Sequence, residues 1–245
     1  MIKIYERLSQ VYDSHWGDFS GQYIDWINRL LIERGVVQGK ILDLACGTGT
    51  LALGLAHFGH IVHGIDISVE MIERARVKSA GLSNISFDIQ DMVQFKADGM
   101  FNLVVCSFDS INYLRKSNHV RKMLSRVAST LDENGLFIFD SNTKIMYQSY
   151  SKETIILELD GQAVIQHCRY DSVRKEAMTM FSFLDGTYEI HRQRPYDYDE
   201  ILPFLIAAEL YTVCLFSWFD VIPYTSKTAK LFCVAEKRRK CAISQ

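Results

Sequence analysis

The hydrophobic positions in the first part of the chain show two patterns: some recur at the spacing of a helix, and others form short runs that are typical of strands. Between residues 20 and 34 they recur at helical spacing and Gly35 follows as a C-cap, which predicts an amphipathic helix. Short apolar runs then alternate with helical patterns, and strands that alternate with helices form right-handed β-α-β units. The pattern therefore predicts a doubly wound α/β domain whose mostly parallel sheet is covered on both faces. The predicted strands cover residues 40–45, 61–65, 85–89, 101–106 and 136–139.

After residue 142 the pattern changes to short strands in pairs. Asp160-Gly161 separates the first pair and Asp185-Gly186 separates the second. An Asp-Gly dipeptide between two strand-like runs is typical of a type I′ hairpin turn. We therefore expect a small antiparallel sheet beside the α/β domain. Its strands are predicted at residues 154–159, 162–170, 177–184 and 187–192.

The C-terminal part of the chain returns to longer elements. Residues 199–210 are predicted as a helix, although Pro203 fits there only in the first turn, where its missing N–H is not needed. Two closing strands are predicted over residues 211–219 and 230–236. The predicted division is residues 1–150 with 195–245 for the α/β domain, and residues 151–194 for the antiparallel β insertion.

The composition is ordinary for a globular protein, because 48% of the 245 residues are apolar and 23% are charged. The 27 basic and 29 acidic residues nearly balance, so no broad positive surface for nucleic acid or anionic lipid is expected. The six cysteines form no C-x-x-C pair, and no apolar stretch has the length of a membrane span. These features predict a soluble, cytoplasmic protein without a metal site.

A turn of small residues follows the first predicted strand. The segment DLACGTG at residues 43–49 leads from this apolar strand into a helical pattern. Glycines let a backbone turn tightly and let a ligand approach it, and the next helix offers unpaired N–H groups. Asp66 ends the second predicted strand, so its carboxylate is expected to accept hydrogen bonds from a ribose in the same crevice. Gly47, Gly49 and Asp66 therefore predict a nucleoside-binding site.

Two ligand classes use such a turn. The spacing Gly47-x-Gly49-x-x-Ala52 also fits the dinucleotide fingerprint, which leaves a nicotinamide-dependent dehydrogenase open. Asp43, however, would repel a pyrophosphate, whereas it can bind or organise water around an α-ammonium group. S-adenosylmethionine carries that group and has no phosphate. Asp43 therefore favours S-adenosylmethionine, and no Tyr-x-x-x-Lys pair follows the fourth predicted strand.

These segments resemble the motifs of the class I S-adenosylmethionine-dependent methyltransferases, from about residue 12 to residue 236. Residues 43–49 resemble the first motif, residues 66–68 the acidic second motif, residues 91–92 the adenine-proximal motif and residues 108–113 the motif after the fourth strand. Ala45 departs from the family pattern, in which many members have a glycine. The candidate cofactor-binding residues are Tyr12, Tyr23, Asp43, Ala45, Gly47, Gly49, Asp66, Ile67, Met71, Asp91, Met92, Ser107 and Phe108.

The resemblance implies a seven-stranded mixed sheet with strand order 3-2-1-4-5-7-6, in which strand seven is antiparallel. It also implies that Asp91 approaches the adenine amino group and that Met71 and Met92 pack near the adenine. Tyr12 and Tyr23 resemble lid residues that close over the methionine end of the cofactor. The implied product of the cofactor is S-adenosylhomocysteine.

The methyl acceptor is expected at the carboxyl ends of the fourth and fifth strands, where ligands bind in open α/β sheets. The exit of the antiparallel sheet adds an imidazole, a guanidinium and a phenol that suit a polar acceptor. Similar sequences with such an insertion include methyltransferases of amino sugars and related amines, in which the insertion tends to cover the acceptor or to form a dimer contact. The catalytic candidates are Asp109, Tyr113 and His191, and the acceptor-binding candidates are Asn112, Asp140, Asn142, Arg194 and Tyr196.

Methyl transfer from a sulfonium needs alignment of the acceptor and exclusion of water more than it needs a strong base. Carboxylates at the mouth of the sheet favour a cationic amine, so the sequence predicts N-methylation of a small molecule, with O-methylation left open. A non-catalytic S-adenosylmethionine-binding protein and an RNA or DNA methyltransferase are also left open, although no Asn-Pro-Pro-Tyr-like motif and no basic domain are present. The chain is expected to be a monomer or a homodimer.

Overall fold

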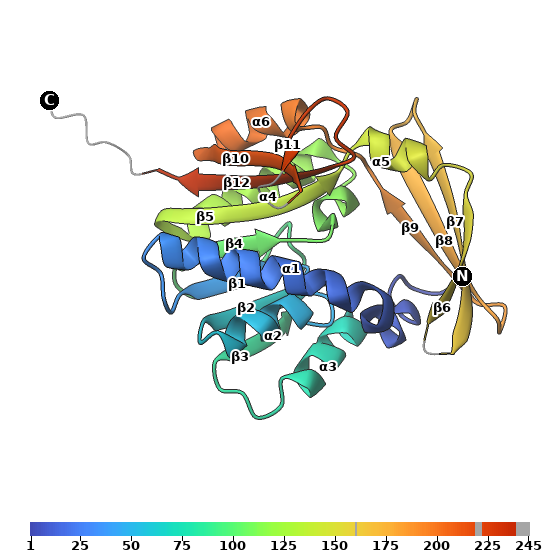
Figure 1. Ribbon diagram of the computed structural model, residues 1–245, viewed down its shortest axis with the longest axis horizontal. Coiled ribbons are helices and arrows are strands. Elements are labelled where there is room, and N and C mark those ends of the chain that lie inside the picture. Colours follow the sequence, from blue (N-terminus) through green and yellow to red (C-terminus); the bar gives the residue numbers. More distant parts are fainter. Residues whose placement is uncertain (160, 219–221, 239–245) are drawn as a thin grey trace, which may run out of the picture.

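The computed structural model describes residues 1–159, 161–218 and 222–238, and within them the chain forms two separate sheets (Figure 1). The larger sheet carries helices on both faces, and the smaller sheet stands beside one end of it. Asp160 of the first predicted turn, Phe219 at the end of a predicted strand and residues 239–245 lie outside the described residues. Among the described helices, none is both long enough and apolar enough to cross a membrane.

Within the described residues, the larger sheet has the predicted order of seven strands and one further strand at its edge. From edge to edge it reads β11-β10-β12-β5-β4-β1-β2-β3, and its first five strands along the chain are parallel. β12 is antiparallel to both β5 and β10, as expected for strand seven. The two-residue β11 at the edge is an addition that the pattern did not predict. The strands are β1 Lys40–Leu44, β2 Ile61–Asp66, β3 Ile85–Ile89, β4 Phe101–Cys106, β5 Leu131–Asn142, β10 Leu210–Trp218, β11 Ile222–Pro223 and β12 Lys230–Lys237.

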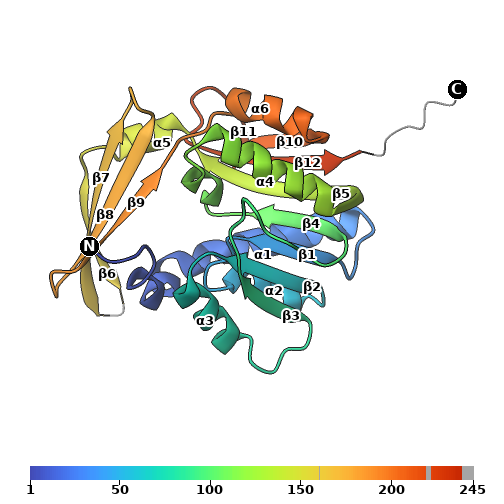
Figure 2. The ribbon, with the colours of Figure 1, turned by 180° about the vertical axis from the view of Figure 1, so that it is seen from behind.

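Helices bury an apolar core on each face of this sheet. Successive strand residues point to opposite faces, so Ile41 packs in the core under α1 and α2, whereas Leu42 and Leu44 pack in the core under α4 and α6. Figure 1 shows α1 in front of the sheet, and Figure 2 shows α4 in front of its other face. The helices are η1 Leu8–Gln10, α1 Tyr12–Glu33, α2 Thr50–His57, α3 Val69–Lys78, η2 Ser110–Tyr113, α4 Ser117–Thr130, α5 Lys144–Ser149 and α6 Tyr198–Ala207.

The smaller sheet is antiparallel in the order β6-β7-β8-β9, as predicted. Gly186 has the left-handed φ of 80° that the turn between β8 and β9 requires. The N-terminal segment packs against this sheet, because Leu8 and Val11 share an apolar cluster with Phe181 and its neighbours. The segment thereby joins the two sheets. The strands are β6 Thr154–Leu159, β7 Gln162–Asp171, β8 Glu176–Phe183 and β9 Tyr188–Gln193.

Three elements differ from the sequence prediction. α1 begins at Tyr12 rather than near residue 20, because its first turns face a cavity and the smaller sheet and so lack a regular apolar stripe. β5 begins at Leu131, ahead of the predicted residue 136, with an irregular register against β4. Pro203 lies inside α6 beyond the first turn, so that helix lacks one of its interior hydrogen bonds.

Candidate active site

The turn after β1 is built on left-handed backbone. Ala45, Gly47 and Gly49 have φ values of 56°, 55° and 77°. A Cβ atom on Gly49 would lie 2.7 Å from Cζ of Phe87 and 2.9 Å from Cβ of Ala75, so only glycine fits there. Ala45 adopts its conformation with a side chain present, at a cost of about 1–2 kcal/mol. The resulting turn leaves open space above its backbone.

Asp66 holds this turn from the end of β2. Its Oδ2 accepts a hydrogen bond from the N–H of Gly47 at 2.9 Å, and its Oδ1 accepts one from the N–H of Ser68 at 2.8 Å. Burial raises the pKa of Asp66 more than these N–H groups lower it. The Ser68 hydroxyl in turn caps α3 by accepting the N–H of Met71. The sequence therefore places one carboxylate at the centre of the site and fixes it with backbone donors.

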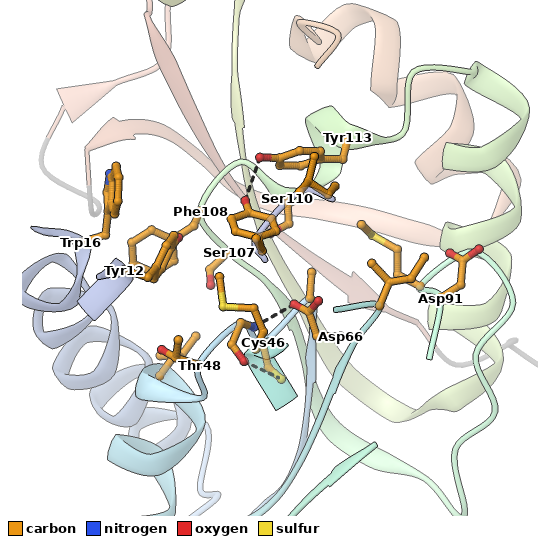
Figure 3. A pocket seen from close by; sticks show the side chains of 18 of the residues that line it. Tyr12, Trp16, Cys46, Thr48, Asp66, Asp91, Ser107, Phe108, Ser110 and Tyr113 are labelled. Carbon is orange, nitrogen blue, oxygen red and sulfur yellow. Dashed lines mark hydrogen bonds between the residues drawn. The ribbon is translucent and has the colours of Figure 1, made fainter. Parts of the chain in front are cut away.

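A cavity of about 460 Å³ lies above the turn, and we call it the turn cavity (Figure 3). Figure 3 shows Asp66 at its centre, with Asp91 toward one side and Tyr12 and Trp16 toward the other. Most of the predicted cofactor-binding residues line it. They are Tyr12, Ala45, Gly47, Asp66, Ile67, Met71, Asp91, Met92, Ser107 and Phe108.

Asp43 is buried behind the turn and does not line this cavity. Its side chain is 1% exposed, and neither carboxylate oxygen has a hydrogen-bond partner among the described residues. Burial, and then repulsion from Asp66, raise the pKa of Asp43 well above its usual range. An unpaired buried carboxylate lowers the stability of a fold. A cation in the turn cavity would offset that cost.

A second cavity of about 380 Å³ lies between the larger sheet and the inner face of the smaller sheet, and we call it the interface cavity. Aromatic side chains dominate its lining. They are Tyr5, Tyr12, Trp16, Phe108, Tyr113, Tyr147, Tyr150 and Phe181. The first five of these also line the turn cavity, and we call them the aromatic wall. The two cavities therefore meet at this wall.

The loop after β4 carries two strained residues into the site. Phe108 and Asp109 have consecutive left-handed φ values of 57° and 49°, which are costly for residues with side chains. Asp140 holds the loop in place, because its Oδ2 accepts the N–H of Asp109 at 2.8 Å. The other Asp140 oxygen accepts the hydroxyl of Tyr23 at 2.6 Å. Tyr23, predicted as a lid residue, therefore lies buried beneath the loop.

Lys230 joins two carboxylates at the floor of the interface cavity. Its Nζ donates to Asp140 Oδ2 at 2.6 Å and to Asp109 Oδ1 at 3.1 Å. Gln193 Nε2 donates to the other Asp109 oxygen at 2.7 Å. Burial raises the pKa of Asp109, an effect that the nearby ammonium only partly offsets. Two carboxylates thus share one ammonium: Asp109 lines the cavity, and Asp140 is buried beneath it.

A chain of hydrogen bonds links the aromatic wall to His191. The hydroxyls of Tyr5 and Tyr113 are 2.7 Å apart, and the Tyr113 hydroxyl lies 2.8 Å from Nδ1 of His191. His191 is buried, and its Nε2 lies 3.1 Å from a carboxylate oxygen of Glu189. Burial raises the pKa of Tyr113 well above its usual range, so Tyr113 stays a neutral phenol and can pass a proton on to the imidazole.

The comparisons with known proteins agree with this geometry. A family model described as "Methyltransferase domain" matches residues 41–135, which include the turn, Asp66 and the loop after β4. A protein of Geobacillus sp. (strain WCH70) that is named as a methyltransferase is 30% identical over 208 residues, which cover 81% of this chain and 84% of that protein. The chain belongs to the class I S-adenosylmethionine-dependent methyltransferases.

Solved methyltransferase structures share the whole fold. An S-adenosylmethionine-dependent methyltransferase from Clostridium acetobutylicum ATCC 824 superposes with a TM-score of 0.82 at 24% identity, over 96% of this chain and 99% of that one. A sugar N-methyltransferase from Streptoalloteichus sp. ATCC 53650 gives a TM-score of 0.70 at 22% identity, over 94% and 93% of the two chains. The protein is an S-adenosylmethionine-dependent methyltransferase, so the dehydrogenase and non-catalytic hypotheses are wrong.

The residues of the turn cavity fit the methyl donor of this family. S-adenosylmethionine carries a sulfonium and an α-ammonium, and the cavity presents carboxylates from Asp66 and Asp91 with the unpaired charge of Asp43 behind the turn. The glycine turn leaves room for a ligand against its backbone. Asp43 does not line the cavity, so its predicted part in binding the α-ammonium group, directly or through water, stays a prediction.

Some predicted acceptor-binding residues hold the fold together instead. Asn112 is fully buried, its Nδ2 donates to the carbonyls of Asn142 and Arg194, and its Oδ1 accepts the Asn142 N–H. Arg194 pairs with Glu200 and stacks 4.5 Å from the ring centre of Tyr196. Predicted residues that line neither cavity are Tyr23, Asp43, Gly49, Asn112, Asp140, Arg194 and Tyr196.

The remaining predicted residues of the acceptor side do line the interface cavity, and their catalytic and binding roles stay predictions. They are Asp109, Tyr113, Asn142 and His191. Sequence reasoning missed Gln193 and Glu189, although both share a face of β9 with His191 by the two-residue period of a strand. Lys230 and Tyr5 were also missed, and no local signal marks them, because their partners lie far away in the sequence.

Proposed function

We propose that this methyltransferase transfers its methyl group to the amine nitrogen of a small molecule held in the interface cavity. The pair of carboxylates at Lys230 carries the proposal, because Asp109 in the cavity lining and Asp140 buried beneath it share one ammonium group. A protonated amine would balance the second negative charge, whereas a neutral hydroxyl would not. The bound donor supplies a methyl group on a cationic sulfonium and leaves as a neutral thioether once the acceptor lone pair has taken the methyl.

The aromatic wall supports the same acceptor class. Its rings line both cavities, so they surround the region through which the methyl group would pass. The face of such a ring attracts a cation by about 0.5–1 kcal/mol at exposed sites and by about 2 kcal/mol in desolvated ones. A cationic amine, and a methylated amine after it, would be stabilised there. The rings also exclude water, which would otherwise compete for the acceptor lone pair.

The hydrogen-bonded chain supplies a path for the proton that an ammonium acceptor must lose before its nitrogen can attack. The proton would pass to the hydroxyl oxygen of Tyr113 while the phenol proton moves to Nδ1 of His191, 2.8 Å away. The imidazolium formed would lie beside the Glu189 carboxylate. The N–CH₃ bond then forms as the S–CH₃ bond breaks, and the bonding pair remains on sulfur.

The named relatives and the domain arrangement give further support. The solved sugar N-methyltransferase superposes on 94% of this chain, which is a likeness of fold. In our proposal residues 151–194 cover the acceptor, because β7, β8 and β9 line the interface cavity from its far side. The proposed acceptor is therefore an amine small enough for a cavity of about 380 Å³.

Matched acceptor pairs test the proposal. Each pair consists of two cyclic small molecules that differ only in an amino or a hydroxyl group on the same carbon, and amino sugars with their hydroxy analogues form one series. Formation of S-adenosylhomocysteine and the position of the methyl group are read by mass spectrometry. We expect methylation of the amino member and none of its hydroxy partner. Turnover restricted to hydroxyl acceptors would establish O-methylation and overturn the proposal.

Asp109→Asn sharpens this test, because it removes a negative charge at the cavity floor and keeps the side-chain shape. We expect KM for the amine to rise about tenfold, in line with the loss of one charge-assisted interaction of roughly 1.5 kcal/mol. Glu176→Gln is the matched control, since Glu176 pairs with Arg115 and Arg192 outside the interface cavity. An unchanged KM in the Asp109 variant would argue against recognition of a cation by this floor.

A further inference from the structure

Glu189 is a fully buried carboxylate that joins the N-terminal segment to His191. Its Oε1 accepts the backbone N–H groups of Arg7 and Leu8 at 2.7 and 2.9 Å. Its Oε2 accepts the N–H of Tyr5 at 2.7 Å and contacts Nε2 of His191 at 3.1 Å. One side chain therefore satisfies three backbone donors of one segment and one side-chain donor of β9.

The segment held by Glu189 closes both cavities. Tyr5 lines the turn cavity and the interface cavity, and its φ of 64° places it in a left-handed conformation that needs support from its surroundings. Leu8 packs in the apolar cluster on the smaller sheet. Release of the Tyr5 N–H would therefore loosen a residue of the aromatic wall and its hydrogen bond to Tyr113.

The same carboxylate decides which nitrogen of His191 carries the proton. Burial raises the pKa of Glu189, but the hydrogen bonds from His191 and from the three backbone N–H groups outweigh it, so the pKa lies below its usual range and Glu189 is ionised. An ionised carboxylate only accepts hydrogen bonds, so Nε2 of a neutral His191 carries the hydrogen. Its Nδ1 then keeps a lone pair toward the Tyr113 hydroxyl, 2.8 Å away.

We propose that Glu189 is a positioning residue that couples closure of the N-terminal segment to the proton-accepting tautomer of His191. When the segment is closed, Glu189 is held by the three N–H groups at the place where it orients the imidazole. The coupling rests on the proposed function only in that His191 receives a proton from the acceptor. The geometry of Glu189 itself does not depend on the identity of that acceptor.

Glu189→Gln changes both roles of the side chain, which are to bind the backbone N–H groups of the N-terminal segment and to orient His191. The glutamine oxygen should take the place of Oε1, because the N–H groups of Arg7 and Leu8 both need an acceptor there. The NH₂ group then stands where Oε2 was and opposes the N–H of Tyr5. It also donates to Nε2 of His191, which must give up its hydrogen, so Nδ1 becomes protonated and can no longer accept the Tyr113 proton.

Nuclear magnetic resonance of the full chain bound to S-adenosylhomocysteine tests both consequences without any methyl acceptor. In the wild-type protein, ¹⁵N imidazole signals should show His191 with its hydrogen on Nε2. In Glu189→Gln they should show it on Nδ1. Amide exchange at Tyr5 should become at least about tenfold faster in the variant, while Arg7 and Leu8 change less, since only Tyr5 loses its acceptor.

Arg7→Gln is the matched control, because it removes the contact between Arg7 and Asp185 and leaves Glu189 intact. It should leave both the exchange of the Tyr5 amide and the His191 tautomer unchanged, because Glu189 keeps its hydrogen bonds to the backbone N–H groups and to His191. A wild-type His191 with its hydrogen on Nδ1 overturns the proposal even if the Glu189 variant does not fold. Unchanged exchange at Tyr5 in a folded Glu189→Gln overturns it as well. Failure of the amine panel would leave these readouts untouched.

Discussion

The turn cavity and the interface cavity share a wall but are built in different ways. The turn cavity depends on consecutive backbone, with Asp66 only 19 residues from the Gly47 N–H that it binds. The interface cavity depends on side chains from distant segments, such as Lys230 with Asp109, 121 residues apart, and Tyr5 with Glu189, 184 residues apart. One cavity is therefore a property of backbone conformation, and the other is a property of a buried polar network whose charges must balance.

Loss of Lys230 should have the largest effect, and it should fall on the network. Lys230→Met leaves Asp109 and Asp140 as buried carboxylates without their cation, so the free energy of unfolding should drop by about 3–5 kcal/mol. Affinity for S-adenosylhomocysteine should change little in the folded protein, because Lys230 does not line the turn cavity. Urea unfolding and calorimetry measure the two quantities, and Lys227→Met, at an exposed position shortly before β12, is the control.

The loss of stability in Lys230→Met should depend on pH in a defined direction. Burial already raises the pKa of Asp109, and the loss of the ammonium that lowers it raises the folded-state value further. The folded state then binds a proton at a pH where the unfolded state does not, so the stability deficit should shrink as the pH falls. An equal deficit at neutral and at mildly acidic pH would show that the carboxylates are not its cause.

Gly49→Ala should disrupt the turn cavity by distorting the turn, although Gly49 does not itself line that cavity. The left-handed φ of 77° and the contacts of a new Cβ with Phe87 and Ala75 together should cost about 2–4 kcal/mol of stability. Binding of S-adenosylhomocysteine should fall below detection in calorimetry. Gly186→Ala is the control, because Gly186 has a similar φ of 80° but open space around its Cβ position, and it should cost only about 1 kcal/mol without loss of binding.

The same contrast explains which parts of the molecule the sequence could predict. β1, its turn and Asp66 were predictable because strand, glycines and carboxylate follow each other within one β-α-β unit. The antiparallel sheet was predictable from its turn residues and its two-residue period. Arg194 and Tyr196 were expected at the acceptor, but β9 ends at Gln193, and beyond its end the two side chains pack on each other. Partners such as Glu189 and Tyr5 meet only through the tertiary fold, which no local pattern encodes.

Asp43→Asn should show that the buried carboxylate behind the turn lowers the stability of the protein. Removal of the unpaired charge should raise the free energy of unfolding by about 1–3 kcal/mol at neutral pH. Because the folded-state pKa of Asp43 is raised, the wild-type protein loses stability relative to the variant as pH rises through the interval above the ordinary aspartate pKa. The stability difference between the two proteins should therefore vanish in acid.

The affinity of the Asp43 variant completes this comparison. S-adenosylhomocysteine retains the α-ammonium group, so its dissociation constant should rise roughly tenfold, which corresponds to a lost charge interaction of about 1–2 kcal/mol. Calorimetry at two salt concentrations separates this loss from a change of shape, since only the charge interaction weakens with salt. A variant that is both less stable and equally tight in binding would assign Asp43 a structural role.

Lys78→Met should have the smallest effect. It tests whether the contact between α1 and the turn affects both cavities. Lys78 Nζ donates to Asp13 Oδ2 at 2.7 Å and to the hydroxyls of Thr48 and Thr50, so it ties α1 to the turn. Burial raises the pKa of Asp13, but Lys78 and the threonines lower it further, so this tie should persist until the pH falls through the lowered value. The groups are partly exposed, and the pair should contribute about 0.2–1 kcal/mol.

A loss of that size corresponds to at most about a fivefold weaker binding of S-adenosylhomocysteine, and the difference should disappear in high salt. Arg74→Met on the same helix is the control. Because α1 also carries Tyr12 and Trp16 of the aromatic wall, the variant should bind an amine acceptor more weakly by a similar factor. A weaker affinity for S-adenosylhomocysteine with an unchanged acceptor KM would mean that the position of α1 affects the turn cavity and not the interface cavity.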